Sequence, residues 1–408
     1  MIFLAAEDIT RQINLIGQHI TNQGGIRVAI YLPNSTEFLA ALFACSFSKN
    51  LTPVLIPFDV PVEELVSMLG RAAVDTLVTA PGAFPFDAVV KAYPALRQLI
   101  WVVDEGSSHM DWNEVPEGTG SSVNVSTWQD IVNDAPADAG TELGSSSAET
   151  TPQDVVTFWQ NKSGQMEDMV RFSQANLVAG IAGQIAAVPS RDRLSPSDLF
   201  LPADPLTNIH TLTLTLVALF SNASVAFNSV AGRNCDLALA TRGVAPTVIV
   251  ASPQSVLRTH AEAMGKLGAG LAKASHALSI RTLVQEGVLS TSHFLSGFAA
   301  GAKPAIGNVP GKLRLLYVAD RAGASDAQIP STVLADLRIF LGTRIIYALS
   351  AARVAGSVTQ TAYFDYRVSE DIQTHFGAPV TSVEVFFKDS GNHKTTDEEA
   401  VGEVSEYK

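Results

Sequence analysis

The sequence predicts an α/β protein with two doubly wound βαβ subdomains, whose mainly parallel sheets pack together. Short apolar runs of strand length alternate with segments whose apolar residues recur at helical spacing, which is typical of parallel βαβ units. The first helix shows this spacing in Ile9, Ile13, Ile16 and Ile20, and Gly24 ends it. Hydrophobic residues make up 47% of the 408 residues and charged residues 16%, so the chain can bury a large core.

The first subdomain is expected over residues 1–104. Residues 27–32 form an apolar run of strand length, and Pro33 begins the turn that follows. Ser35 or Thr36 is suited to cap the next helix, because a side-chain oxygen there accepts a hydrogen bond from an unpaired helix amide. The alternation continues with helices at 37–48 and 61–72 and with strands at 52–56, 76–79 and 99–103.

The composition of the chain changes after the first subdomain. Residues 105–152 are rich in Ser, Gly, Asp, Glu, Thr and Pro, which predicts a flexible linker. A second α/β subdomain is expected over 153–375, with a helical insertion at 253–301. Residues 376–408 predict the start of a small antiparallel β-barrel, in which 383–388 alternate like a half-exposed strand. Strands in the second subdomain are predicted at 154–159, 199–202, 224–227, 247–251, 313–318 and 343–348.

Charge and hydropathy exclude several classes of partner. The net charge of -13 argues against nucleic acid, because phosphate binding needs clustered Lys and Arg. The most apolar stretch, 209–231, is interrupted by Thr, Ser and Asn, so no transmembrane segment is expected. Cys45 and Cys235 lie in apolar stretches without a CxxC pattern, which indicates buried thiols in a reducing compartment and no zinc site. No signal peptide is evident, and a cytoplasmic location is expected.

Two motifs in the first subdomain carry a family resemblance. Residues 28–45 (VAIYLPNSTEFLAALFAC) and 51–57 (LTPVLIP) resemble the opening of adenylate-forming, AMP-binding enzymes such as acyl-CoA synthetases, luciferases and peptide-synthetase adenylation domains. The helical stretch between Ser252 and Leu313 is similar to long-chain acyl-CoA synthetases in layout. Further segments follow in the order of that superfamily: NL at 176–177, LP at 201–202, LRLL at 313–316, RII at 344–346, FGAP at 376–379 and VGEV at 401–404.

The resemblance implies a loop for the ATP phosphates, rich in Gly, Ser and Thr, directly after the strand at 154–159. This chain has WQNKSGQMEDM at that place, over 159–169, and most of the family's small residues are replaced. Glu167 and Asp168 would bring two negative charges close to a triphosphate, where like charges repel. The residues left as candidate nucleotide contacts are Lys162, Ser163 and Gly164.

The resemblance also implies a Tyr-Gly-x-Thr-Glu motif after the strand at 343–348. Leu349 takes the place of the aromatic residue, Ser350 follows it, and Arg353 stands where the family has its metal-binding glutamate. An arginine side chain has no acceptor atom and cannot ligate Mg²⁺. Leu349, Ser350 and Arg353 are therefore candidate nucleotide contacts without a metal ligand among them. Asp204 stands where the family has an aromatic-His pair, and His210 lies nearby but out of register, as a structural histidine would.

Two hypotheses follow for the function. In the first, the chain is a ligase-like protein that is catalytically impaired alone and binds an acyl chain, an acyl-adenylate, a nucleotide or a protein partner. In the second, it is a divergent fatty acyl-CoA or acyl-AMP ligase that uses ATP and Mg²⁺ together with a C-terminal domain as partner. The family's hinge aspartate and C-terminal domain, with its catalytic lysine, would lie beyond Lys408, so no C-terminal cap domain is expected within these residues. No catalytic residue, metal ligand or cofactor is assigned.

Overall fold

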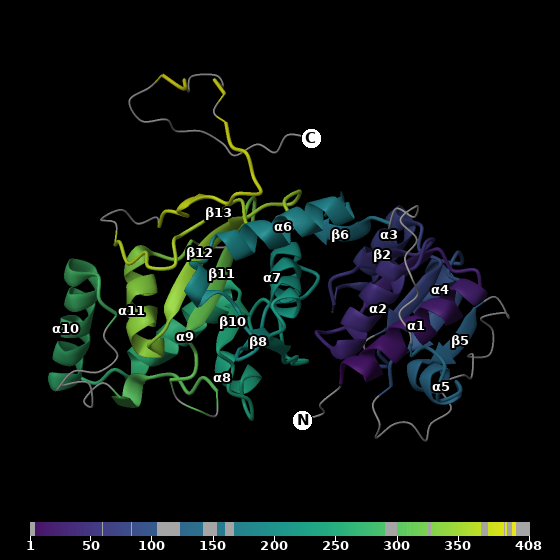
Figure 1. The fold of residues 1–408 in the computed structure, drawn as a ribbon, viewed down its shortest axis with the longest axis horizontal. Helices are drawn as coiled ribbons and strands as arrows, with labels where there is room; N and C mark the ends of the chain where they lie inside the picture. The colour runs from purple at the N-terminus through teal and green to yellow at the C-terminus, as the bar shows by residue number, and fades with distance from the viewer. Residues whose placement is uncertain are drawn as a thin grey trace.

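The protein contains two large β-sheets, each covered by helices, and Figure 1 shows the two halves side by side. The structure is a computed structural model. It describes residues 5–58, 60–82, 84–103, 123–141, 153–159, 167–289, 300–307, 309, 311–324, 328–368, 374–386, 388–389 and 394–396. Within these residues each sheet has seven strands and is mainly parallel, which confirms the predicted fold class.

The first sheet lies in the half drawn in purple and blue in Figure 1. All of its neighbouring strands run parallel except the last pair, which is antiparallel. Its strands, in spatial order, are β5 (Asn124–Thr127), β4 (Gln98–Trp101), β3 (Thr76–Thr79), β1 (Arg27–Tyr31), β2 (Thr52–Leu55), β6 (Val155–Trp159) and β7 (Asp168–Phe172). Its helices are α1 (Ala6–Asn22), α2 (Thr36–Phe47), α3 (Val62–Ala72), α4 (Phe86–Ala92) and α5 (Trp128–Asn133).

Alternation along β1 builds the two cores of this half. Val28 and Ile30 pack with α1 and α2 on one face of the sheet, whereas Ala29 and Tyr31 pack with α3 and α4 on the other. Each strand of a parallel sheet is buried on both faces, which is why β1 is a continuous apolar run. Ser35 caps α2 as predicted, because its Oγ accepts a hydrogen bond from the backbone N–H of Phe38 at 3.1 Å.

The second sheet lies in the half that runs from teal to yellow in Figure 1. Its first five strands along the chain are parallel, and two short antiparallel strands extend one edge. In spatial order the strands are β14 (Ala378–Pro379), β13 (Thr359–Gln360), β12 (Arg344–Ser350), β11 (Leu315–Arg321), β10 (Val248–Ala251), β8 (Leu199–Pro202) and β9 (Ser224–Val225). Its helices are α6 (Gln174–Ala186), α7 (Ile209–Phe220), α8 (Leu237–Ala240), α9 (Pro253–Lys266), α10 (Leu271–Glu286) and α11 (Ser331–Leu341), with a 3-10 helix at Ser190–Asp192.

Helix α7 links the two halves. Ile209 and Leu212 of α7 belong to the same buried cluster as Ile30 of β1 and Phe38 of α2. Helix α6 lies close to the turn after β12, because a Cβ at Gly180 would come within 2.5 Å of the carbonyl oxygen of Ala355. The cluster around α7 therefore joins the second half to the first.

Three expectations need correction. The strand at 154–159 was predicted in the second subdomain, but β6 and β7 belong to the first sheet, because β6 pairs with β2. The range 105–152 was predicted to be a flexible linker, but β5 and α5 lie within it: β5 pairs with β4, and Trp128 is buried. The remainder of that range, 105–122 and 142–152, lies outside the described residues. Residues 383–386 do not form a strand, because alternation provides no hydrogen-bonding partner by itself. The β-barrel expected over 376–408 stays a prediction, since much of it lies outside the described residues.

No helix among the described residues is long and apolar enough to cross a membrane. Cys45 and Cys235 are buried and not bonded to each other, as expected for thiols in apolar surroundings. Burial raises the pKa of the Cys235 thiol to about 11, so this side chain stays protonated near neutral pH.

Candidate functional site

A cavity of about 460 Å³ lies where the two halves meet. It is lined by the segments that follow β1, β2, β8 and β9 and by the ends of β6 and β11. We refer to it as the junction cavity. Ligands of open α/β sheets bind outside the carboxyl ends of the strands, and this volume is within the range of small-molecule sites. The junction cavity is therefore the candidate functional site.

Asn34 fixes the turn between β8 and α7 at the edge of this cavity. Its Nδ2 donates hydrogen bonds to the carbonyl oxygens of Pro202 at 3.0 Å and Asp204 at 2.9 Å. Its Oδ1 accepts a hydrogen bond from the backbone N–H of Leu206 at 2.8 Å. Asn34 is buried and directly follows β1, so one side chain of the first half holds the backbone of the second.

The carboxylate of Asp204 is the centre of a buried polar network. Its Oδ2 accepts hydrogen bonds from Nδ2 of Asn208 at 2.6 Å and from Oγ1 of Thr211 at 2.9 Å. The Nη2 of Arg321 lies 3.8 Å from the same oxygen, which makes an ion pair without a hydrogen bond. The Oδ1 of Asp204 is buried and has no hydrogen-bond partner among the described residues.

Arg321 is the cation that connects this network to the cavity. It is the last residue of β11, and its side chain is only 14% exposed. Its guanidinium carbon lies 5.8 Å from the centroid of the Trp159 ring, a cation–π distance. Trp159 is the last residue of β6, so this contact joins the ends of strands from both sheets.

His210 is buried in the first turn of α7 and has a structural role there. Burial lowers its pKa to about 4, although the negative charge of Asp204 acts in the opposite direction. The imidazole is therefore neutral at pH 7. Its Nδ1 lies 3.3 Å from Oγ of Ser357, and its Nε2 has no hydrogen-bond partner in the described part of the chain. His210 is not among the residues that line the junction cavity.

The candidate phosphate contacts Lys162, Ser163 and Gly164 lie outside the described residues. Glu167, which follows them, is bound by Arg71 of α3. The Nη2 of Arg71 donates to the carbonyl oxygen of Glu167 at 2.6 Å, and Nη1 of Arg71 lies 3.7 Å from its carboxylate. One of the two acidic residues expected to repel a phosphate is thus already paired with a cation.

The candidates after β12 do not line the junction cavity. Ser350 pairs in register with Arg321, but its side chain is fully buried and its Oγ donates to the carbonyl oxygen of Asp320 at 2.8 Å. Leu349 is half-buried and Arg353 is exposed. The structure therefore brings this segment beside the strand of Arg321. Asn34, Asn208, Arg233 and Arg321 are among the polar residues that line the cavity, and Asp204 pairs with Arg321. Neither Asn208 nor the two arginines was expected at the site from the sequence; Asp204 was noted only at the place of the family's aromatic-His pair, and Asn34 only as part of a turn.

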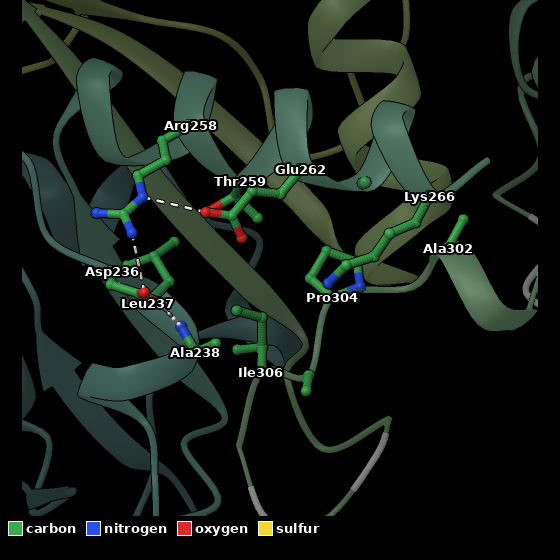
Figure 2. A pocket seen from close by; sticks show the side chains of 12 residues that line it. Asp236, Leu237, Ala238, Arg258, Thr259, Glu262, Lys266, Ala302, Pro304 and Ile306 are labelled. Atoms are coloured by element: carbon green, nitrogen blue, oxygen red, sulfur yellow. Dashed lines mark hydrogen bonds and ion pairs between the residues drawn. The ribbon is translucent and has the colours of Figure 1, made fainter.

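A second pocket, shown in Figure 2, lies between α8 and α9 and measures about 60 Å³. Arg258 forms ion pairs with Asp236 and with Glu262, each at 3.1 Å. Lys266 also lines the pocket. This volume holds at most a few waters, and the charge of Arg258 is already balanced by two carboxylates. The junction cavity is the better candidate for an organic ligand.

No family model and no curated protein matches this sequence. Solved structures do match. The anthranilate CoA ligase AuaEII, in complex with anthranoyl-AMP, has a TM-score of 0.59 at 15% identity over 91% of this chain and 58% of its own. A benzoate CoA ligase from Burkholderia xenovorans LB400 has a TM-score of 0.60 at 14% identity over 96% and 63%. The o-succinylbenzoate CoA synthetase MenE from Bacillus subtilis, in complex with AMP, has a TM-score of 0.57 at 13% identity over 92% and 58%.

These matches concern the fold. The chain spans 58–63% of the length of these three ligases. The N-terminal domain of FACL13 from Mycobacterium tuberculosis, a shorter structure, is covered to 71% with a TM-score of 0.56. The expected closeness to long-chain synthetases stays a prediction, because identities of 12–15% carry no information on the acyl group. The chain has the fold of the large N-terminal domain of the adenylate-forming, AMP-binding CoA ligases.

Proposed function

We propose that this protein binds an acyl or acyl-adenylate ligand in the junction cavity and does not adenylate a carboxylate by itself. The observation that carries the proposal is the cavity at the carboxyl ends of both sheets. Two proteins of this fold, AuaEII and MenE, were solved with an acyl-adenylate bound. Leu32, Phe58, Leu206 and Ile209 give the cavity apolar walls suited to an acyl or aryl group.

The residues around the cavity do not fit a Mg²⁺ ion. Mg²⁺ binds oxygen ligands, usually one or two carboxylates, in octahedral geometry. It helps adenylation by neutralising phosphate charge. Asp204 already accepts two hydrogen bonds and faces the cation Arg321, which would repel a metal. Asp320 accepts a hydrogen bond from the hydroxyl of Tyr347 at 2.5 Å. Arg353, at the place of the family's glutamate, has no acceptor atom.

Titration calorimetry and a pyrophosphate assay test this proposal. We expect anthranoyl-AMP to bind with a heat that saturates at one site, and ATP·Mg²⁺ with a panel of fatty and aromatic acids to release no pyrophosphate. Release of pyrophosphate by the chain alone, or tight binding of ATP·Mg²⁺, would overturn the proposed lack of adenylation. Failure of anthranoyl-AMP and of every acid to bind would overturn the binding role.

A divergent ligase is the second candidate function. It is supported by the length comparison, since the matched ligases are longer and this chain covers 58–63% of them. In this case a C-terminal domain is the protein partner, and it supplies the charge that stabilises the transition state. The chain would then release pyrophosphate only when a ligase C-terminal domain is added in trans. No turnover under that condition rejects this candidate.

We also propose a cytoplasmic location, supported by the two buried, unbonded cysteines. Fractionation of cells that express a tagged chain tests it. Recovery in a membrane or secreted fraction would contradict it.

A further inference from the structure

The charged side chains that line the junction cavity are both arginines, and the carboxylate of Asp204 lies 3.8 Å from one of them. Arg321 and Arg233 line the cavity, and none of its described lining residues is Asp or Glu. The whole chain carries a net charge of -13. Positive charge in a concave, mostly apolar site raises the local concentration of anions.

The N–H groups of Arg321 are available to a ligand. A guanidinium carries five donors. In the described part of the chain, none of those on Arg321 donates a hydrogen bond, and the nearest charge is Oδ2 of Asp204 at 3.8 Å. That oxygen is already shared by Asn208 and Thr211, so Asp204 holds Arg321 in place without using its donors.

The guanidinium of Arg321 also lies over the ring of Trp159, with its carbon 5.8 Å from the ring centroid. A cation over an aromatic face leaves the edge of the guanidinium, where the N–H groups lie, free for in-plane contacts. Both residues line the cavity. The guanidinium of an arginine binds carboxylate or phosphate through two parallel hydrogen bonds.

We propose that the ligand of the junction cavity is anionic and that Arg321 binds its carboxylate or phosphate group. Asp204 acts as a positioning residue for this arginine. This inference rests on the proposed binding function and names the chemical group that the site selects. The apolar walls formed by Phe58, Leu206 and Ile209 then hold the uncharged part of the same ligand.

Three small probes of matched shape test the inference: benzoate, phenyl phosphate and neutral benzamide. Their dissociation constants are measured by calorimetry, with Trp fluorescence as a second readout and Trp159→Phe to identify the reporting side chain. We expect at least one anion to bind about tenfold or more tightly than benzamide, since hydrogen bonds to charged groups are the stronger ones. The stronger of the two anions identifies carboxylate or phosphate as the group recognised.

Variants separate the role of Arg321 from a general effect of charge. Arg321→Gln should remove the preference for the anion, and Arg321→Lys should keep part of it, because lysine is a point charge without the paired donors. Arg281→Gln, at an exposed arginine of α10, is the matched control and should change nothing. Circular dichroism checks the fold, and if Arg321→Gln is unfolded, Arg321→Lys decides the outcome.

The outcomes distinguish the two proposals. Equal binding of benzamide and the anions, or an anion preference that survives in Arg321→Gln, overturns the role of Arg321 and leaves the binding function intact. No binding of any probe or of anthranoyl-AMP overturns both.

Discussion

The guanidinium carbon of Arg321 lies 5.8 Å from the ring centroid of Trp159, and these residues end strands in different sheets. Trp159 comes from the first half of the protein and Arg321 from the second. Both side chains are largely buried, at 7% exposure for Trp159 as a residue and 14% for the Arg321 side chain. The contact therefore places the wall of the junction cavity at the interface between the halves, where a ligand would touch both.

Replacing Trp159 should weaken this interface. Trp159→Ala removes a buried aromatic side chain and is expected to lower the free energy of unfolding by about 3 kcal/mol, whereas Trp159→Phe keeps a ring and should cost less. Urea denaturation followed by circular dichroism measures both. Trp101→Phe is the matched control, since its ring contacts, Phe84 and Phe86, lie within the first half. A Trp159→Ala variant as stable as the wild type would show that the contact contributes nothing.

Asp204 should be the most sensitive position of the polar network. Asp204→Ala leaves Asn208, Thr211 and Arg321 without their shared acceptor. Removing one partner from a buried charged network costs about 3–5 kcal/mol, because the remaining groups stay desolvated. Asp204→Asn keeps the shape and one acceptor oxygen and should cost less. The free energy of unfolding checks both, with the exposed Asp138→Asn as control. Equal stability of Asp204→Ala and Asp138→Asn would contradict the network.

Much of the first half could be predicted from the sequence, because its strands are buried on both faces. The run at 27–32 is apolar after Arg27, the run at 76–79 is buried at every position, and they became β1 and β3 with nearly the expected bounds. Strand β5 was missed because Asn124–Thr127 is polar and lies at the edge of the sheet, where only pairing with β4 defines it. Periodicity carries no information about such a partner.

The site could not be predicted, for a related reason. Strand β11 was expected to end at Val318, where the apolar run ends, but pairing with β12 extends it through Asp320 to Arg321. The predicted strand thus ends three residues before Arg321, and the sequence does not place this arginine at the carboxyl end of the sheet. Asn34 and Asp204 are 170 positions apart, and only the packing of α7 against the first half brings them into contact.

His210 should make the protein less stable in mild acid. Its pKa is about 4 in the folded protein, against an ordinary value of 6.5, so the unfolded chain binds a proton at higher pH than the folded one. Stability contributed by neutral His210 is present above pH 6.5 and is lost progressively between pH 6.5 and 4, by up to about 3 kcal/mol. Melting temperatures of the wild type and His210→Gln over this range test it. Parallel curves for the two proteins would contradict the assignment.

Asp336 should affect the stability of the protein at lower pH than His210 does. Burial alone would raise the pKa of its carboxyl, but hydrogen bonds from His260 at 3.0 Å and His276 at 2.8 Å outweigh burial and hold the pKa below 3.8. A lowered pKa means that the folded state favours the carboxylate, so this stability is present above pH 3.8 and is lost as pH falls through the folded value. Asp336→Asn should flatten the acid limb of the melting temperature below pH 4. An acid limb below pH 4 that is the same in Asp336→Asn and in the wild type would contradict this prediction.

Replacing Ser350 tests whether this serine has a structural role or contacts a nucleotide. In the structure its Oγ donates to the carbonyl oxygen of Asp320, and the side chain is fully buried and is not among those that line the junction cavity. Ser350→Ala should therefore lower the free energy of unfolding by about 1 kcal/mol, the net contribution of one hydrogen bond, and leave the dissociation constant for anthranoyl-AMP unchanged. Urea denaturation and calorimetry on the same preparation measure the two effects. A loss of affinity without a loss of stability would return Ser350 to the nucleotide contacts that the family resemblance first implied.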